Sequence, residues 1–142
     1  LFPHEVTSLT RIDDRFAARP HRYIYVQRAD RDKPFRAALP NDPRSQPNNS
    51  IARFDVRERS LRSFFVGETH LVQEPCFVPR EGSRTEGDGY LLATVHDLAQ
   101  MRCDLLILDA REMTEIGRVR LPFRNALQVH GAWASEDDLP LV

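Results

Sequence analysis

Cysteine, long apolar runs and an excess of charge of either sign are all scarce or missing in this sequence, and each absence narrows the class of protein. Only two cysteines occur in the 142 residues, Cys76 and Cys103, and both lie in apolar segments without a C-x-x-C spacing. We therefore expect buried free thiols and a reducing, cytoplasmic compartment. No apolar run approaches the roughly 18 residues that a membrane-spanning helix requires, and no charged-then-apolar signal peptide opens the chain.

The charges of the chain are balanced, because 20 basic side chains stand against 21 acidic ones and the net charge is −1. A nucleic-acid partner normally requires a basic face, so none is expected. The sequence also lacks H-E-x-x-H, G-x-S-x-G and any glycine loop that could cradle a phosphate. These absences remove the commonest local signatures of a metalloprotease, a serine hydrolase and a nucleotide-binding enzyme.

The histidines show no local clustering. They are His4, His21, His70, His96 and His130. None of them has the i, i+4 or H-x-H spacing that places two ligands on one local face, so a metal site made from them alone would need distant strands to converge. We expect His21 and His70 to be exposed loop residues and His96 to be a half-buried strand residue.

What the sequence does contain is a series of short segments typical of β-strands. Residues 22–27 alternate, with Tyr23 and Tyr25 on one face and Ile24 and Val26 on the other, and such alternation of aromatic and β-branched residues favours a strand. The other predicted strands are residues 50–56, 61–66, 75–79, 90–97, 104–109 and 115–121. They recur at intervals of about 8 to 15 residues, which predicts an all-β meander as in sandwiches, barrels and propeller blades. The proline- and asparagine-rich residues 40–49 predict an exposed loop.

The most informative candidate site lies in residues 121–133. His130 precedes Gly131, whose backbone freedom would let a loop deliver the imidazole inward, and Trp133 could cover it. Glu74 stands directly before Pro75 at the start of a predicted strand. A carboxylate that accepts a hydrogen bond from an imidazole N–H fixes the tautomer and leaves the other nitrogen for a metal, so Glu74 and His130 could form such a pair. The competing interpretation is an ordinary solvated histidine and a solvated strand end.

Five strings, in their order and spacing, resemble the C-terminal part of the carotenoid cleavage oxygenase family, which includes lignostilbene dioxygenases and apocarotenoid-cleaving enzymes. They are EPCFVPR, EGDGYLLATVHD, DLLILDAREM, RVRLPF and HGAW, and the earlier string RIDDRFAARPHRYIYV resembles a family segment too. The resemblance covers nearly the whole chain. It implies that residues 1–142 are the C-terminal portion of a single seven-bladed β-propeller domain, incomplete as given, and the start at Leu1 rather than methionine agrees with a piece of a longer protein.

The resemblance also implies a metal centre. In the family, four histidines bind a non-haem Fe(II) on the propeller axis, and three glutamates support three of them. His130 matches the last ligand, in the HG-x-W-like segment, and Glu74 matches the supporting glutamate of the EP-x-FVPR segment. The other three ligands lie upstream in the family, and none of the remaining histidines matches their motifs. One position departs from the pattern, because Ser8 stands where a supporting glutamate is usual, unless Glu5 substitutes for it.

The activity implied by the resemblance is the cleavage by O2 of a C=C double bond in a carotenoid, apocarotenoid or stilbene, giving two carbonyl products. The expected partners are thus O2 and an apolar polyene or stilbene, with peripheral membrane contact as a way to collect a lipid-soluble substrate. Phe123 and Trp133 are candidates to line the cavity. One alternative is a non-catalytic propeller piece that binds a partner protein. Another is a self-contained β-sandwich metalloenzyme that uses His96 and His130.

Overall fold

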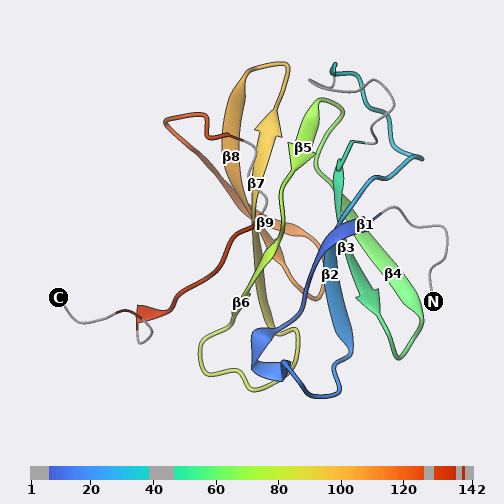
Figure 1. Cartoon of the computed structure of the whole chain (residues 1–142), viewed down its shortest axis with the longest axis vertical. Helices are drawn as coiled ribbons and strands as arrows, with labels where there is room; N and C mark the ends of the chain where they lie inside the picture. Colours follow the sequence, from blue (N-terminus) through green and yellow to red (C-terminus); the bar gives the residue numbers. More distant parts are fainter. Residues whose placement is uncertain (1–6, 39–46, 127–129, 137–138, 140–142) are drawn as a thin grey trace.

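The chain forms two antiparallel sheets that lie side by side (Figure 1). The computed structural model describes residues 7–38, 47–126, 130–136 and 139. Within that part of the chain, the regular elements are nine β-strands and one short 3-10 helix, η1 (Asp14–Phe16). The all-β prediction is confirmed. None of the described residues forms a helix long and apolar enough to cross a membrane.

The first sheet has the strand order β1-β2-β3-β4. Its strands are β1 (Thr7–Arg11), β2 (Tyr23–Arg28), β3 (Ser50–Asp55) and β4 (Ser60–Phe65). The pairing of β1 with β2 contains an irregularity. Ser8 lies opposite Gln27 and Arg11 lies opposite Tyr25, so residues 8–11 of β1 face the shorter stretch 25–27 of β2. One extra residue is therefore accommodated in β1, where Leu9 adopts a φ of 51°. Such a bulge bends a strand and changes the direction of the side chains that follow it.

The second sheet is built around its longest strand, β7. Its strands are β5 (His70–Val72), β6 (Cys76–Pro79), β7 (Gly89–Asp97), β8 (Arg102–Asp109) and β9 (Glu115–Arg120). β7 pairs with β8 on one side, and on its other side β5 and β6 follow one another along the same edge. Val72 lies opposite Val95 and Cys76 opposite Leu92, so one extra residue is accommodated between β5 and β6. Pro75 has no N–H to give to a ladder, which accounts for the break at this point.

The main hydrophobic core fills the space between the two sheets. Tyr25 and Ile51 of the first sheet pack with Leu91, Leu106 and Leu108 of the second, and all five are fully buried. Burying one such side chain stabilises the fold by about 1.5–3 kcal/mol, so this layer fixes the two sheets relative to each other. The alternation predicted for β2 is confirmed, because Tyr23 and Tyr25 join this core, whereas Ile24 and Val26 join a smaller cluster on the other face.

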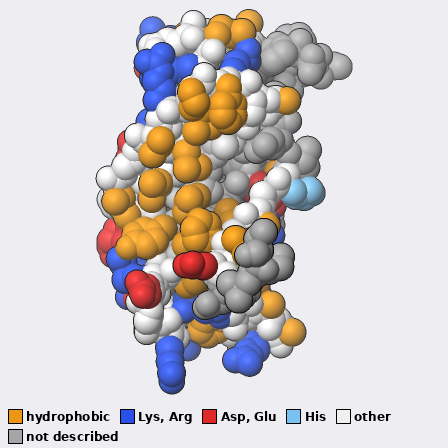
Figure 2. Space-filling view, turned by 90° about the vertical axis from the view of Figure 1, so that its left-hand side faces the viewer, with side chains coloured by type: hydrophobic (Ala, Val, Ile, Leu, Met, Phe, Trp, Pro, Cys, Tyr) orange, Lys and Arg blue, Asp and Glu red, His pale blue; other side chains and the backbone are white. Residues whose placement is uncertain are grey.

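The outer face of the second sheet is different. Half-buried residues alternate with buried ones along much of β7 and β8, and hydrophobic side chains gather on that side of the molecule in Figure 2. Ile116 and Val119 of β9 are more than half exposed. The second sheet therefore has two apolar faces, one of which packs on the first sheet.

Most of the strand boundaries agree with the sequence prediction, and each of the seven predicted strands is found within two residues of its predicted ends. The strands β1 and β5 were not predicted. The predicted loop at residues 40–49 falls mostly outside the described residues. At its end the prediction of an exposed loop is wrong, because Asn49 is fully buried. The Asn49 side chain accepts a hydrogen bond from the Asp30 N–H at 2.8 Å and donates one to the Asp30 carbonyl at 3.0 Å.

Candidate functional site

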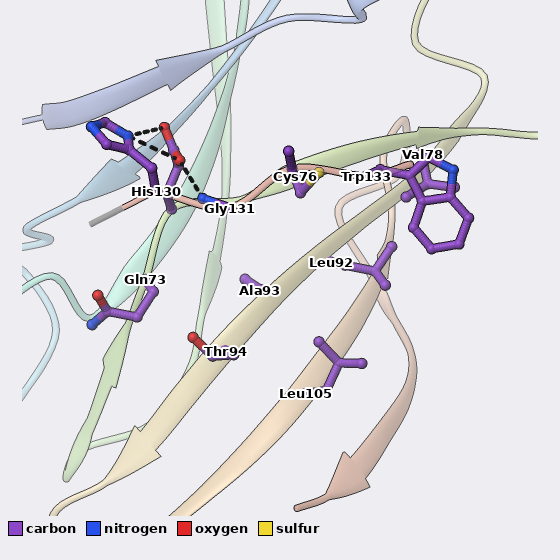
Figure 3. A pocket seen from close by; sticks show the side chains of 12 residues that line it. Gln73, Cys76, Val78, Leu92, Ala93, Thr94, Leu105, His130, Gly131 and Trp133 are labelled. Carbon is purple, nitrogen blue, oxygen red and sulfur yellow. Dashed lines mark hydrogen bonds and ion pairs between the residues drawn. The ribbon is translucent and has the colours of Figure 1, made fainter. Parts of the chain in front are cut away.

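The structure brings Glu74 and His130 together, as their sequence contexts suggested. The His130 Nδ1 atom lies 3.4 Å from each carboxylate oxygen of Glu74. The next residue is held more closely, since the Gly131 N–H donates to Glu74 Oε2 at 3.0 Å. Figure 3 marks these contacts of His130 and Gly131 with dashed lines, and Glu74 lies in the break between the end of β5 and the start of β6. The extra residue at that break lets Glu74 leave the edge of the sheet and meet the loop that carries His130.

The two partners differ in their exposure to solvent. The Glu74 side chain is 6% exposed, whereas the His130 ring is 73% exposed. Because Nδ1 faces the carboxylate, Nε2 points away from it (Figure 3). No described residue hydrogen-bonds to Nε2. A neutral imidazole that donates from Nδ1 has a free lone pair on Nε2, which is the usual arrangement of a metal-binding histidine with a supporting carboxylate.

A third side chain, Arg11, completes this group, although no sequence motif pointed to it. Arg11 Nε lies 3.3 Å from Glu74 Oε1, and Arg11 Nη2 donates a hydrogen bond to the Gly131 carbonyl. Arg11 comes from the end of β1, directly after the bulge. Ser8 pairs with Gln27 through the backbone of the same strand, but its side chain and all of Glu5 lie outside the described residues. The consequence of serine at the usual glutamate position stays a prediction.

A cavity of about 230 Å³ begins at the Glu74–His130 pair and runs along β6 and β7. Its walls include the apolar side chains of Val78, Leu92 and Leu105. Trp133 also borders it, but Figure 3 places this ring near Val78, at the far end from His130. Trp133 therefore does not cover the imidazole. Phe123 is 63% exposed and borders a different surface depression, so among the described residues it does not line this cavity, and its place in the substrate cavity of the whole protein stays a prediction.

Gly131 does not need the special backbone freedom of glycine that was predicted for it. Its φ lies outside the left-handed region, and a Cβ added there would meet no described atom within 4 Å. The Gly131 N–H donates a hydrogen bond to the Glu74 carboxylate, and the Gly131 carbonyl accepts one from Arg11. These two hydrogen bonds hold the loop against Glu74.

The remaining histidines are placed elsewhere. His21 is exposed, as predicted. The prediction for His70 is wrong, because it begins β5 and its ring is 17% exposed against Asp97. His96 is fully buried rather than half-buried, and its Nε2 lies 4.0 Å from the Cys103 sulfur. Burial lowers the pKa of His96, and the nearby positive charge of Arg124 adds to the effect. His4 lies outside the described residues.

These positions give no support to a self-contained metalloenzyme built on His96 and His130. His96 does not line the cavity that His130 borders. Among the described residues, no three or more histidine, cysteine, aspartate or glutamate side chains form a group that could hold a metal. Both cysteines are free, and burial raises the pKa of each thiol, which disfavours the reactive thiolate.

Nearly the whole chain is similar to proteins of one known family. The model of the family described as retinal pigment epithelial membrane protein matches residues 4–135. The chain is 41% identical over 133 residues to resveratrol cleavage oxygenase 1 of Aspergillus fumigatus, covering 91% of this chain and 27% of that protein. It is 33% identical over 138 residues to lignostilbene-α,β-dioxygenase isozyme III of Sphingomonas paucimobilis, covering 96% of this chain and 28% of that protein.

Solved structures give the same result for the fold. The lignostilbene dioxygenase of Pseudomonas brassicacearum superimposes with a TM-score of 0.83 at 31% identity, over 92% of this chain and 27% of that one. A variant of the Synechocystis apocarotenoid oxygenase gives a TM-score of 0.76 at 26% identity, over 92% of this chain and 26% of that one. The predicted β-propeller blades are thus confirmed. The chain spans about a quarter of the length of the relatives it matches.

Proposed function

The chain belongs to the retinal pigment epithelial membrane protein family, the carotenoid cleavage oxygenases, and on this premise we propose that it is part of an oxygenase that cleaves a C=C double bond with O2. The relatives at 41% and 33% identity are named for resveratrol and lignostilbene, one at 37% is named for isoeugenol, and one at 30% is named for carotenoids. We favour a stilbene as the substrate, with an apocarotenoid or carotenoid as the second choice. The products would be two carbonyl compounds.

The observation that carries this proposal is the Glu74–His130 pair within the family fold. His130 would be one of four histidines that hold a non-haem Fe(II), the other three coming from outside these 142 residues. The geometry fits such a ligand, because Nδ1 is directed at a buried carboxylate and Nε2 is directed away from it. Neutral imidazole suits Fe(II), and the bound metal supplies the redox chemistry for O2.

The residues of this chain contribute orientation and shielding. Glu74 keeps the proton of His130 on Nδ1, so the lone pair of Nε2 stays available. The carboxylate is 6% exposed, and its contacts are stronger there than they would be in water because the local dielectric is low. The cavity walls of Val78, Leu92 and Leu105 continue this apolar environment along the second sheet.

The proposal is tested by replacing His130 with alanine in the full-length protein that contains this chain. We expect the variant to lose both bound iron, measured by elemental analysis, and cleavage of a stilbene, measured by the release of aldehyde. His21→Ala is the matched control, because His21 is exposed and, among the described residues, its ring is hydrogen-bonded only to a nearby backbone carbonyl. Retention of iron and cleavage in His130→Ala would reject the assignment. A wild-type protein without iron or cleavage activity would favour the alternative of a protein-binding propeller.

A further inference from the structure

We infer that Arg11 is a positioning residue that fixes the loop carrying His130 against Glu74. The inference rests on the proposed function, since it assigns a residue to the support of the same histidine. It concerns one group of contacts, made by Arg11, Glu74 and Gly131, which we call the clasp. The three residues come from the end of β1, from the break between β5 and β6, and from the segment after β9.

The clasp holds the backbone on both sides of Gly131. Its N–H donates to Glu74 Oε2 at 3.0 Å, and its carbonyl accepts from Arg11 Nη2. The imidazole of His130 is held less directly, since its Nδ1 lies 3.4 Å from the carboxylate oxygens. Because a hydrogen bond weakens as its length grows beyond about 3.2 Å, the position of the ring depends strongly on the backbone next to it. Arg11 and Glu74 together define that backbone.

Arg11 also compensates the charge of Glu74. The Glu74 side chain is 6% exposed and that of Arg11 is 28% exposed, with Nε 3.3 Å from Oε1. A carboxylate that is largely removed from water requires a nearby opposite charge or several hydrogen bonds. The arginine meets this requirement and, with a second nitrogen of the same planar group, bonds the Gly131 carbonyl. A lysine has one compact ammonium and cannot reproduce this fixed fork.

Two irregular strand pairings place the members of the clasp. One extra residue in β1 precedes Arg11, and another lies at the break that contains Glu74. Bulges of this kind redirect side chains and are common next to functional sites. Leu9, within the first irregularity, adopts a φ of 51°, which is unusual for a leucine. Both bulges therefore direct side chains from two different sheets toward one loop.

The experiment compares Arg11→Gln and Arg11→Lys with the wild type in the full-length protein. Arg84→Gln is the control, because Arg84 is an exposed arginine in the turn before β7. Hydrogen–deuterium exchange is followed in the metal-free protein on the peptide that contains Gly131, and Fe(II) affinity is measured by anaerobic titration. Exchange in peptides from β7 and β8 reports whether each variant remains folded.

We expect both Arg11 variants to exchange faster at the Gly131 peptide while β7 and β8 remain protected. Fe(II) binding should weaken about tenfold in both, the lower end of the range for loss of a group that supports a metal ligand. Arg84→Gln should match the wild type. Wild-type exchange and affinity in Arg11→Gln, or full restoration by Arg11→Lys, would overturn the inference. If the wild type binds no Fe(II) but the Arg11 variants still exchange faster, the clasp stands and the proposed function fails.

Discussion

Two carboxylate–imidazole pairs differ in their surroundings, Glu74–His130 beside the second sheet and Asp97–His70 within it. In the first pair, the His130 ring is 73% exposed and no described residue bonds its Nε2. In the second, the His70 ring is 17% exposed, with Nδ1 3.3 Å from the Thr69 hydroxyl and Nε2 3.7 Å from Asp97. A carboxylate beside an imidazole can thus leave one ring nitrogen free for a metal, as at His130, or form a purely structural contact, as at His70. The difference lies in whether the second nitrogen is occupied.

The carboxylates differ in the same way. Asp97 accepts hydrogen bonds from the Thr69 hydroxyl and from the N–H groups of Ala99 and Gln100, so it organises the turn between β7 and β8. Glu74 accepts from Gly131 and faces His130, and it is therefore tied to one loop. We therefore expect Asp97 to serve the stability of the fold and Glu74 to serve the position of His130, the proposed iron ligand. Three substitutions test this distinction.

The largest effect is expected for Asp97→Ala. The change leaves the N–H groups of Ala99 and Gln100 without their carboxylate, and it removes the partner of His70. A hydrogen bond to a charged group contributes about 1.5–3 kcal/mol, and the change removes those that the Asp97 carboxylate accepts from Thr69, Ala99 and Gln100, so the midpoint of urea unfolding of the full-length protein should fall clearly. Fe(II) affinity of the folded fraction should not change. A loss of iron comparable to that in His130→Ala would contradict the division between the two pairs.

For Glu74→Gln we expect the reverse pattern, a loss of Fe(II) affinity with only a small loss of stability. The glutamine can still accept the Gly131 N–H but lacks the charge that orients His130, so Fe(II) affinity should fall 10–100-fold. The free energy of unfolding should fall less than in Asp97→Ala, because the glutamine oxygen still accepts the Gly131 N–H and only this one backbone hydrogen bond depends on Glu74.

Anaerobic titration measures the Fe(II) affinity of Glu74→Gln, and urea unfolding measures its free energy of unfolding. Glu112→Gln is the control, since Glu112 is an exposed carboxylate that pairs with Arg62 at 3.0 Å. Unchanged iron affinity in Glu74→Gln would show that Glu74 does not support the proposed iron ligand.

The sequence was sufficient for the features that depend on local pattern. Alternation in residues 22–27 predicted β2 and the two faces of its side chains. The contexts of Glu74 and His130 suggested their pairing, because a strand break at Pro75 and a loop after β9 each had a clear local signal. The resemblance to the carotenoid cleavage oxygenases predicted the family and the propeller blades.

The remaining features depend on contacts between distant segments. Arg11 is 120 residues from Gly131, and its contact requires a bulge that the sequence TSLTR does not reveal. β5 has only three residues, too few to show alternation, so His70 was mistaken for an exposed loop residue. Trp133 lies at the far end of the cavity because its segment runs alongside β6, a direction that no local pattern indicated.

The smallest effect is expected from the pH dependence of His70. Burial lowers the pKa of His70 below its ordinary value of 6.5, although Asp97 acts in the other direction. At pH values between the lowered pKa and 6.5, His70 binds more protons in the unfolded chain than in the folded one. The stability that the neutral His70 contributes is therefore fully present above pH 6.5 and is lost as the pH falls through this window. His70→Gln should therefore lose less stability than the wild type between pH 7.5 and pH 5.5, as measured by urea unfolding. His21→Gln, which changes an exposed ring, should behave like the wild type. An equal loss in all three proteins would show that His70 does not prefer its neutral form, and its structural role would then rest on its contacts with Thr69 and Asp97 alone.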